Sequence, residues 1–273
     1  MASDLTPSQF ADLAETIARE AAVLAARRRA EGVEVADRKS SIVDVVTAAD
    51  REVEALIRAR IAEARPDDAF HGEESGSASG GSGITWVVDP IDGTVNYLYG
   101  SPDYGVSIGV VRGSSDPTSW EAVAGVVVAP ATTTVYRAAV GQGATRDGVP
   151  LTVSAPASLA ETLVATGFGY TADRRREQVA VLAGLIGEVR DIRRGGAASL
   201  DCCGVGAGVV DAYYERGINP WDMAGGSVVA QEAGAAIRIW EAGGTRSFLF
   251  ASPAVADELE ALVRRLERDT LAD

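Results

Sequence analysis

Two aspartates three positions apart, Asp89 and Asp92, stand out in residues 86–97, which read WVVDPIDGTVNY. The apolar, β-branched residues before Asp89 predict a buried strand that delivers this carboxylate to its end. Pro90 is expected to end the strand because proline has no N–H to donate. Gly93 permits a tight turn that can open a helix. The segment therefore predicts two carboxylates displayed where a strand meets a turn.

These carboxylates form the core of a candidate cation site. In such a turn Asp89 and Asp92 can face one point, with the Ile91 carbonyl between them, and magnesium prefers such an all-oxygen donor set. The segment contains no Lys, Arg or His, so two ionised carboxylates about 4 Å apart would repel by about 4 kcal/mol at an effective dielectric of about 20. A bound cation removes that repulsion. The amides of Gly93 and Thr94 would then face a phosphate group.

Taken alone, this segment is more often a simple strand end followed by a turn, since turns favour Asp and Gly. Two further acidic segments bear on the choice. Glu73 and Glu74 follow a short apolar element, and Asp222 lies at the start of a predicted helix in residues 219–226, NPWDMAGG. Singly, a glutamate pair is often a solvated charge pair, and an aspartate in this place is often a helix N-cap. The interpretation therefore depends on whether the three acidic segments together match the motifs of a known protein family.

In order and spacing, these segments resemble the signatures of the inositol monophosphatase family. The resemblance lies in GEE at residues 72–74, DPIDGTVNY at 89–97 and WDMAG at 221–225, and it extends over residues 39–50 and 211–218. It thus covers nearly the whole chain. Residues 94–99 and 167–170 look most like actinobacterial inositol-1-monophosphatases. The resemblance implies an α/β fold of the alternating α-β-α-β-α sandwich type shared with fructose-1,6-bisphosphatase, and a homodimer.

The resemblance also implies a carboxylate-held cluster of two or three Mg²⁺ ions in each site. One ion would be held by Glu73, Asp89 and the Ile91 carbonyl. A second would be held by Asp89, Asp92 and Asp222, so that Asp89 bridges the pair. Such two-metal sites stabilise both the entering and the departing oxygen of a phosphoryl transfer. Inhibition by lithium is a further property that the resemblance implies.

Catalytic roles follow from the same resemblance. Thr94, paired with Asp50 and aided by Glu73, would orient and deprotonate the attacking water. Glu74 is a plausible outer carboxylate of the cluster. These roles rest on the family pattern and not on composition or spacing.

The implied substrate pocket is centred on Glu215, whose carboxylate would accept hydrogen bonds from ring hydroxyls. The other residues expected to contact substrate are Asp92, Gly93, Thr94, Gly196, Ala197 and Ala198. Ala197 departs from the family pattern, because relatives usually carry a hydroxyl residue there. Backbone contacts survive this change, but a side-chain contact does not.

The expected reaction is hydrolysis of a small phosphate monoester, with myo-inositol 1-phosphate as the first candidate. Histidinol phosphate, fructose 1,6-bisphosphate and 3'-phosphonucleotides remain alternatives, because phosphatases of this superfamily share much of the metal chemistry. An interaction protein without catalysis is a further alternative. A serine hydrolase is disfavoured: GVSIG at residues 105–109 fits G-x-S-x-G, but its alternation predicts a continuing strand, and the single histidine, His71, precedes the serine.

Apolar periodicity and turn residues predict the elements that position these groups. A capping box at Thr6 predicts a helix to about Arg29, and a second helix is expected from Thr47 or Asp50 to just before Pro66. Strands are expected at residues 84–89, 104–111, 122–128, 134–140 and 162–166, and short apolar runs occur at 212–214 and 248–250. Helices are expected at 179–186, 227–233 and 255–266. Residues 75–83, rich in Ser and Gly, predict a flexible loop.

The bulk properties narrow the classes of protein. The 273 residues carry a net charge of −14, which repels nucleic acid and anionic membranes, so a small molecule is the expected partner. We find no signal peptide or membrane span and expect a cytoplasmic protein. The two cysteines are adjacent in the sequence, so they cannot form an ordinary disulfide with each other. With a single histidine, the chain also lacks a zinc-type ligand set. We expect an N-terminal α+β subdomain at 1–150 and a C-terminal α/β subdomain at 151–273.

Overall fold

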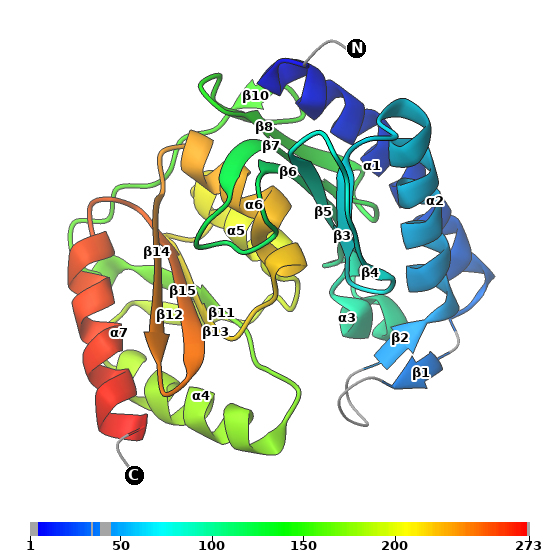
Figure 1. The fold of residues 1–273 in the computed structure, drawn as a ribbon. Helices are drawn as coiled ribbons and strands as arrows, with labels where there is room; N and C mark the ends of the chain where they lie inside the picture. The colour runs from blue at the N-terminus through cyan, green and yellow to red at the C-terminus, as the bar shows by residue number, and fades with distance from the viewer. Residues whose placement is uncertain (1–4, 34, 39–44, 272–273) are drawn as a thin grey trace.

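The structure, a computed structural model, describes residues 5–33, 35–38 and 45–271. Layers of helices and sheets alternate through the molecule, and the two sheets lie on either side of a central pair of helices (Figure 1). Part of the family resemblance, residues 39–44, lies outside the described residues, as do residues 1–4. Among the described residues, no helix combines the length and the apolar character needed to cross a membrane.

The first sheet has eight strands in the order β10-β9-β8-β7-β6-β5-β3-β4. Its strands are β3 (Ala69–Gly72), β4 (Gly76–Ala78), β5 (Ile84–Asp92), β6 (Gly105–Arg112), β7 (Glu121–Ala129), β8 (Thr134–Ala139), β9 (Ala144–Arg146) and β10 (Val149–Pro150). Neighbours pair antiparallel except for β3 and β5, which run parallel. Because of this parallel pair, the ends of β3 and β5 that carry acidic residues lie at the same edge. A separate hairpin joins β1 (Val35–Arg38) and β2 (Val45–Thr47).

Two long helices, α1 (Pro7–Glu31) and α2 (Ala48–Ala64), cover the outer face of this sheet (Figure 1). The predicted capping box of α1 is present, since Thr6 and Gln9 exchange hydrogen bonds. The start of α2 is closed in the same way by Thr47 and Asp50. Both helix starts predicted from the sequence are therefore confirmed, and Asp50 is fixed in the first turn of α2.

The second sheet has five strands in the order β12-β11-β13-β15-β14. They are β11 (Leu163–Thr166), β12 (Asp191–Arg193), β13 (Ala212–Arg216), β14 (Ala236–Ala242) and β15 (Thr245–Ala251), preceded by a short 3₁₀ turn at Leu159–Glu161. On its outer side lie α4 (Ala172–Leu185) and α7 (Ala256–Leu271). Between the two sheets lie α5 (Ala198–Gly206) and α6 (Pro220–Glu232). The predicted α-β-α-β-α sandwich is confirmed.

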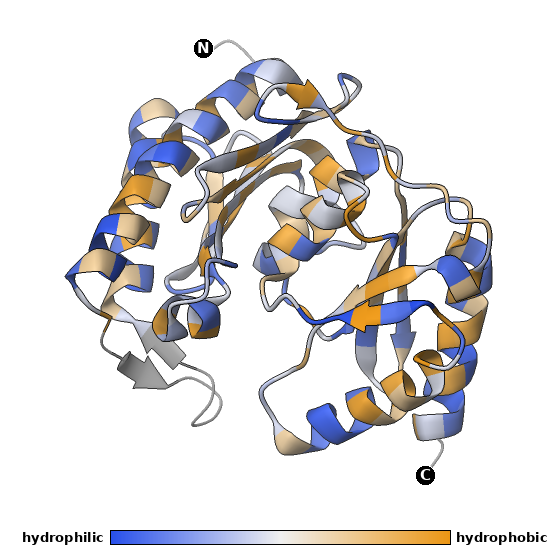
Figure 2. Cartoon of the chain, turned by 180° about the vertical axis from the view of Figure 1, so that it is seen from behind, coloured by the Kyte–Doolittle hydropathy of each residue, from blue (hydrophilic) through white to orange (hydrophobic). Residues whose placement is uncertain are grey.

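The central helix α6 approaches the first sheet through residues with little or no side chain. A Cβ added to Gly109 on β6 would lie 2.5 Å from the Cβ of Ala224. A Cβ added to Gly125 on β7 would overlap the carbonyl oxygen of Gly225. Hydrophobic residues concentrate on the strands between the helical layers (Figure 2). This close packing fixes the start of α6, and therefore Asp222, relative to the sheet.

Three expectations are wrong in detail. The helix expected at residues 179–186 begins earlier, since α4 already starts at Ala172. Pro90 does not end its strand: β5 continues to Asp92, because the register with β6 shifts between Asp89 and Asp92 and this bulge removes the need for a proline N–H. The loop expected at 75–83 contains the short strand β4, which pairs with β3. Gly93 behaves as predicted: it has φ +86 and precedes the short helix α3 (Thr94–Tyr99).

Candidate active site

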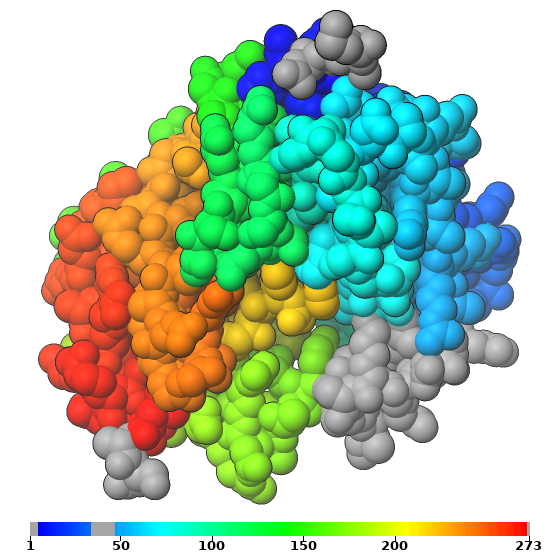
Figure 3. All heavy atoms as spheres, viewed as in Figure 1, coloured from blue at the N-terminus to red at the C-terminus, as the bar shows by residue number. Residues whose placement is uncertain are grey.

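A cavity of about 360 Å³ opens where the two halves of the chain meet. Figure 3 shows a recess between the segment that leads into α4 and the start of α6. The predicted site residues that line the cavity are Glu73, Asp89, Ile91, Asp92, Gly93, Thr94, Gly196, Ala197, Ala198, Glu215 and Asp222. Asp50 is not among the lining residues and lies behind Thr94. Residues from distant parts of the sequence thus share one pocket.

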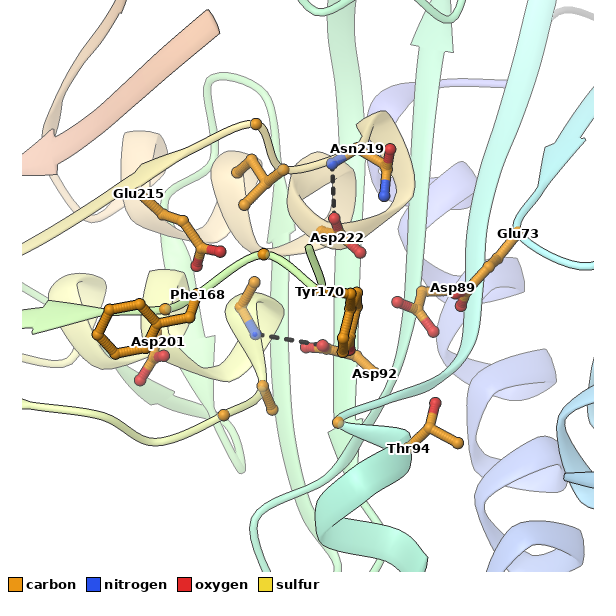
Figure 4. Close-up of a pocket in the computed structure, with 18 of the residues that line it drawn as sticks. Glu73, Asp89, Asp92, Thr94, Phe168, Tyr170, Asp201, Glu215, Asn219 and Asp222 are labelled. Atoms are coloured by element: carbon orange, nitrogen blue, oxygen red, sulfur yellow. Dashed lines mark hydrogen bonds between the residues drawn. The ribbon is translucent and has the colours of Figure 1, made fainter. Parts of the chain in front are cut away.

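Four carboxylates gather at one region of this pocket (Figure 4). Glu73 follows β3, Asp89 and Asp92 lie near the end of β5, and Asp222 lies in the first turn of α6. Burial, and then repulsion from Glu73 and Asp92, raises the pKa of Asp89 and of Asp222 well above the usual range. Burial also raises the pKa of Asp92 to about 6, although hydrogen bonds from Ser199 oppose this shift. Negative charge is therefore costly here without a compensating cation.

The donor chemistry of these groups fits a hard cation. All four side chains are carboxylates, and the backbone amide of Ile91 donates to Asp89 Oδ1 at 3.1 Å, which holds the turn between the two aspartates. Mg²⁺ binds such oxygen donors and often retains several waters. Among the residues that the structure describes, no three His, Cys, Asp or Glu side chains already enclose a metal position. The carboxylates line a common space without converging on one point.

Thr94 connects the pocket to Asp50. Its hydroxyl lies 3.2 Å from Asp50 Oδ1 and 3.2 Å from the carbonyl oxygen of Ile91. The other oxygen of Asp50 accepts from the backbone and hydroxyl of Thr47 at 2.8 and 2.5 Å. Burial raises the pKa of Asp50 to about 6 despite these bonds. The hydroxyl of Thr94 thus has an acceptor on the side away from the solvent, and its oxygen can accept from a ligand in the pocket.

Asp92 is held by a residue that the sequence analysis did not single out. Ser199 donates to Asp92 Oδ2 through its backbone amide at 2.7 Å and through its hydroxyl at 2.5 Å. The amide of Ala198 donates to Oδ1 at 3.2 Å. Ala197 makes no side-chain capping bond at the start of α5. The hydroxyl that reaches Asp92 in this chain therefore comes from Ser199.

Glycine is required where the two halves of the chain meet. Gly93 has φ +86, and a Cβ there would lie 3.0 Å from the carbonyl oxygen of Asp103 and 3.1 Å from that of Gly196. Asn96 ties the same backbone together, because its side-chain amide donates to the carbonyl oxygens of Gly195 and Asp103 at 2.9 and 2.6 Å. These contacts fix α3 against the segment that leads into α5.

Glu215 lies away from the Glu73–Asp89 side of the pocket (Figure 4). Its Oε2 accepts from the hydroxyl of Tyr213 at 2.7 Å. Burial raises the pKa of Glu215 to about 7, whereas the positive charges of Arg194 and Arg174 oppose this shift. A Cβ added to Gly167 would overlap the Glu215 carboxylate, so a larger residue there would displace this side chain. A buried carboxylate is thus held ready to accept further hydrogen bonds.

Several other residues line the pocket without having been predicted as site residues. They are Gly167, Phe168, Gly169, Tyr170, Thr171, Arg174, Arg194, Asp201, Gly217, Ile218 and Asn219. Most of them lie far in sequence from the acidic motifs, whereas Gly217, Ile218 and Asn219 adjoin the motif of Asp222. The arginines supply the local positive charge that the bulk charge of −14 lacks. Burial, followed by repulsion from Asp92 and Glu215, raises the pKa of Asp201 to about 8.

The layered fold with a carboxylate-lined pocket between its sheets defines a phosphatase of the α-β-α-β-α type. A model of the inositol monophosphatase family matches residues 6–268. The chain is 42% identical over 283 residues to an inositol-1-monophosphatase of Mycobacterium bovis, with 96% of each chain covered. It is 39% identical over 194 residues to the Nus factor SuhB of Pasteurella multocida, with 70% of each covered.

A solved structure, Mycobacterium tuberculosis SuhB, superposes with a TM-score of 0.83 at 40% identity, covering 98% of this chain and 100% of that one. The chain therefore belongs to the inositol monophosphatase family, and the resemblance found in its motifs is confirmed.

Proposed function

We propose that this protein hydrolyses myo-inositol 1-phosphate to inositol and phosphate in a Mg²⁺-dependent reaction. The observation that carries the proposal is one pocket in which buried carboxylates face a region suited to phosphate, while Glu215 faces a region suited to a polyol. The relative from Mycobacterium bovis bears the name inositol-1-monophosphatase, which agrees with this assignment. A phosphate monoester is the ligand, and a cytoplasmic homodimer is the form that we expect to be active.

The residues that would hold Mg²⁺ are Glu73, Asp89, Asp92 and Asp222, together with the Ile91 carbonyl. Bound Mg²⁺ would supply positive charge beside the entering and departing oxygens of the phosphoryl group. Two or three ions in each site would balance the buried negative charge that raises the pKa values of Asp89, Asp92 and Asp222. The family resemblance further leads us to expect inhibition by lithium.

The remaining steps belong to side chains and backbone of the chain itself. Thr94 would orient the attacking water through its hydroxyl, and Asp50 would accept the proton that Thr94 passes on, since the two groups lie 3.2 Å apart. Glu73 would assist from the other side of the water. The amides of Gly93 and Thr94 would bind phosphate oxygens. These contacts would place the water in line with the bond to be broken.

Polyol recognition would rest on Glu215 and on the start of α5. The Glu215 carboxylate can accept bonds from neutral hydroxyls, because Tyr213 uses only one of its oxygens. Asp92 and the backbone of Gly196, Ala197 and Ala198 would complete the contacts. A second phosphate placed beside Glu215 would be repelled, so fructose 1,6-bisphosphate should be a poorer substrate.

The test is phosphate release from a panel of esters with Mg²⁺ present: myo-inositol 1-phosphate, histidinol phosphate, fructose 1,6-bisphosphate and a 3'-phosphonucleotide. We expect the highest kcat/KM for the inositol ester. A higher kcat/KM for any other ester would reject the proposed substrate and leave the phosphatase assignment in place. If no phosphate is released from any of the four esters, the proposal that the protein is a phosphate monoester hydrolase is rejected.

A further inference from the structure

The proposed function uses Glu215 at the polyol end of the pocket but leaves a second carboxyl there without a role. Asp201 lies in the first turn of α5, and its side chain lines the same cavity as Glu215. In Figure 4 Asp201, Phe168 and Glu215 lie on one side of the pocket and Glu73 and Asp89 on the other. Asp201 is therefore placed away from Glu73 and Asp89, although the charge of Asp92 still acts on it.

The Asp201 carboxyl lies beside a fixed segment of backbone. It lies against the backbone of Gly195, where an added Cβ would come within 2.7 Å of Asp201 Oδ1. The carbonyl of Gly195 accepts from the side chain of Asn96 at 2.9 Å, so this backbone is itself fixed from the other half of the chain. The backbone amide of Asp201 donates to the Ala197 carbonyl at 2.9 Å. The backbone on both sides of this carboxyl is thus fixed at the wall of the pocket.

The hydrogen-bonding capacity of this carboxyl is unused. Within the described part of the chain, the side chain of Asp201 has no hydrogen bond or ion pair. By contrast, Glu215 accepts from Tyr213 and Asp92 accepts three bonds from α5. The side chain is half-buried and lines the cavity, so its oxygens can bond to water until a ligand displaces that water and supplies donors of its own. An acidic residue in a first helical turn also interacts favourably with the helix dipole, but that interaction does not require the group to line a pocket.

We propose that Asp201 is a specificity-determining residue that accepts a hydrogen bond from a second ring hydroxyl of the substrate, beside the hydroxyl bound by Glu215. Two acceptors at one end of the pocket suit a cyclic polyol with neighbouring hydroxyls. Arg174 and Arg194 line the same cavity and balance part of the negative charge. The inference rests on the proposed function and narrows the substrate class to ring polyol monophosphates.

The test compares Asp201→Asn and Asp201→Ala with the wild-type protein on two esters, myo-inositol 1-phosphate and p-nitrophenyl phosphate, which has no ring hydroxyls. The assay is run at about pH 9, where the Asp201 carboxyl, with its pKa of about 8, is ionised. For the inositol ester we expect kcat/KM to fall by about 10- to 100-fold, mainly through KM, as loss of a charge-assisted hydrogen bond predicts. The fall for p-nitrophenyl phosphate should be several-fold smaller. Asp103→Asn is the matched control, since Asp103 acts on Asp201 through its charge but does not line the pocket.

Each result separates the alternatives. Equal losses on both esters, or no loss on either, would overturn the proposal. If Asp103→Asn lowers kcat/KM as much as Asp201→Asn does, the loss comes from long-range electrostatics and not from a hydrogen bond of Asp201, which would contradict the proposal. Thermal unfolding of each variant identifies any loss of the fold, and Asp201→Asn, which preserves side-chain volume, supplies the answer if Asp201→Ala does not fold. Absence of hydrolysis by the wild-type protein would instead reject the proposed function.

Discussion

Asp222 uses little of its hydrogen-bonding capacity within the protein. One oxygen of this carboxylate accepts from the backbone amide of Asn219 at 2.6 Å and closes the start of α6. Asp92 differs, because both of its oxygens accept bonds from α5. An asparagine at position 92 would turn its NH₂ group toward one of these donors. Substitution at Asp222 is therefore easier to interpret than substitution at Asp92.

We predict that Asp222→Asn removes most phosphatase activity and leaves the fold intact. The amide oxygen can still accept from Asn219, so the helix cap is retained while one negative charge of the metal site is lost. Phosphate release over a range of Mg²⁺ concentrations and a thermal unfolding curve provide the measurements. Near-normal turnover with unchanged Mg²⁺ dependence would contradict a metal-ligating role for Asp222.

Glu215→Gln tests polyol recognition at the same scale. The substitution preserves an acceptor for Tyr213 but removes the charge that strengthens bonds from ring hydroxyls. We expect kcat/KM for myo-inositol 1-phosphate to fall by about 10- to 150-fold, which corresponds to about 1.5–3 kcal/mol. The difference in kcat/KM between myo-inositol 1-phosphate and fructose 1,6-bisphosphate should become smaller, because glutamine does not repel the second phosphate of fructose 1,6-bisphosphate. An unchanged ratio of the two kcat/KM values would argue against this placement of Glu215.

The hydrogen-bonded pair of Thr94 and Asp50 allows a test of the proposed activation of water. Thr94→Ala should lower kcat by about 100-fold or more, in line with losses seen for general acid–base groups, and Thr94→Ser should recover much of it because the hydroxyl is restored. KM should change little. Steady-state kinetics of both variants decide the point: if the serine variant is as slow as the alanine variant, the hydroxyl is not the required group.

At the scale of elements, the close approach of α6 to β6 and β7 positions Asp222. We predict that Gly125→Ala lowers the free energy of unfolding by about 1–3 kcal/mol, because the new Cβ overlaps the backbone of Gly225. Gly187→Ala is the control, since no atom lies within 4 Å of a Cβ added there. Denaturant unfolding of both variants measures the difference. Equal free energies of unfolding for the two variants would show that α6 and β7 can move apart without loss of stability.

The starts of α1 and α2 and most strands could be predicted because their signals are local. The capping boxes at Thr6 and Thr47 and the alternation in β6 need no knowledge of distant residues. The continuation of β5 through Pro90 could not be predicted, because it depends on a bulge in the pairing with β6. The position of β4 depends likewise on its partner strand.

Some residues of the candidate site could be predicted from the sequence, and others could not. The acidic motifs indicated the carboxylates, since Asp and Glu at characteristic spacing carry chemical information in themselves. Ser199 and Asp201 gave no such signal, because their importance arises only when α5 packs between the two sheets. A buried hydroxyl next to a metal motif can be recognised only after the two halves of the chain are brought together.

At the scale of the whole molecule, the pocket carboxylates should link stability to pH and Mg²⁺. Their pKa values are raised in the folded state, to about 6 for Asp92 and well above the usual range for Asp89 and Asp222. Such groups stabilise the fold below the unfolded pKa of about 4, and this stabilisation is lost as pH rises through the folded pKa. The metal-free protein therefore carries a pocket that opposes folding at neutral pH.

We predict that Mg²⁺ raises Tm more at about pH 8 than at about pH 5, because ionised carboxylates bind the cation and protonated ones do not. Differential scanning calorimetry with and without Mg²⁺ at both values measures this difference. Asp222→Asn should reduce the effect at the higher pH. An increase in Tm that is the same at both pH values would show that Mg²⁺ acts elsewhere on the chain.

The central claim is that the carboxylate-lined pocket is a Mg²⁺-dependent catalyst of phosphate ester hydrolysis. Its most direct test is the rate of phosphate release from myo-inositol 1-phosphate by protein stripped of metal with a chelator and then titrated with Mg²⁺. The account predicts almost no release without Mg²⁺ and a saturable recovery as Mg²⁺ is added. Release at the full rate from metal-free protein, or none at saturating Mg²⁺, would contradict it.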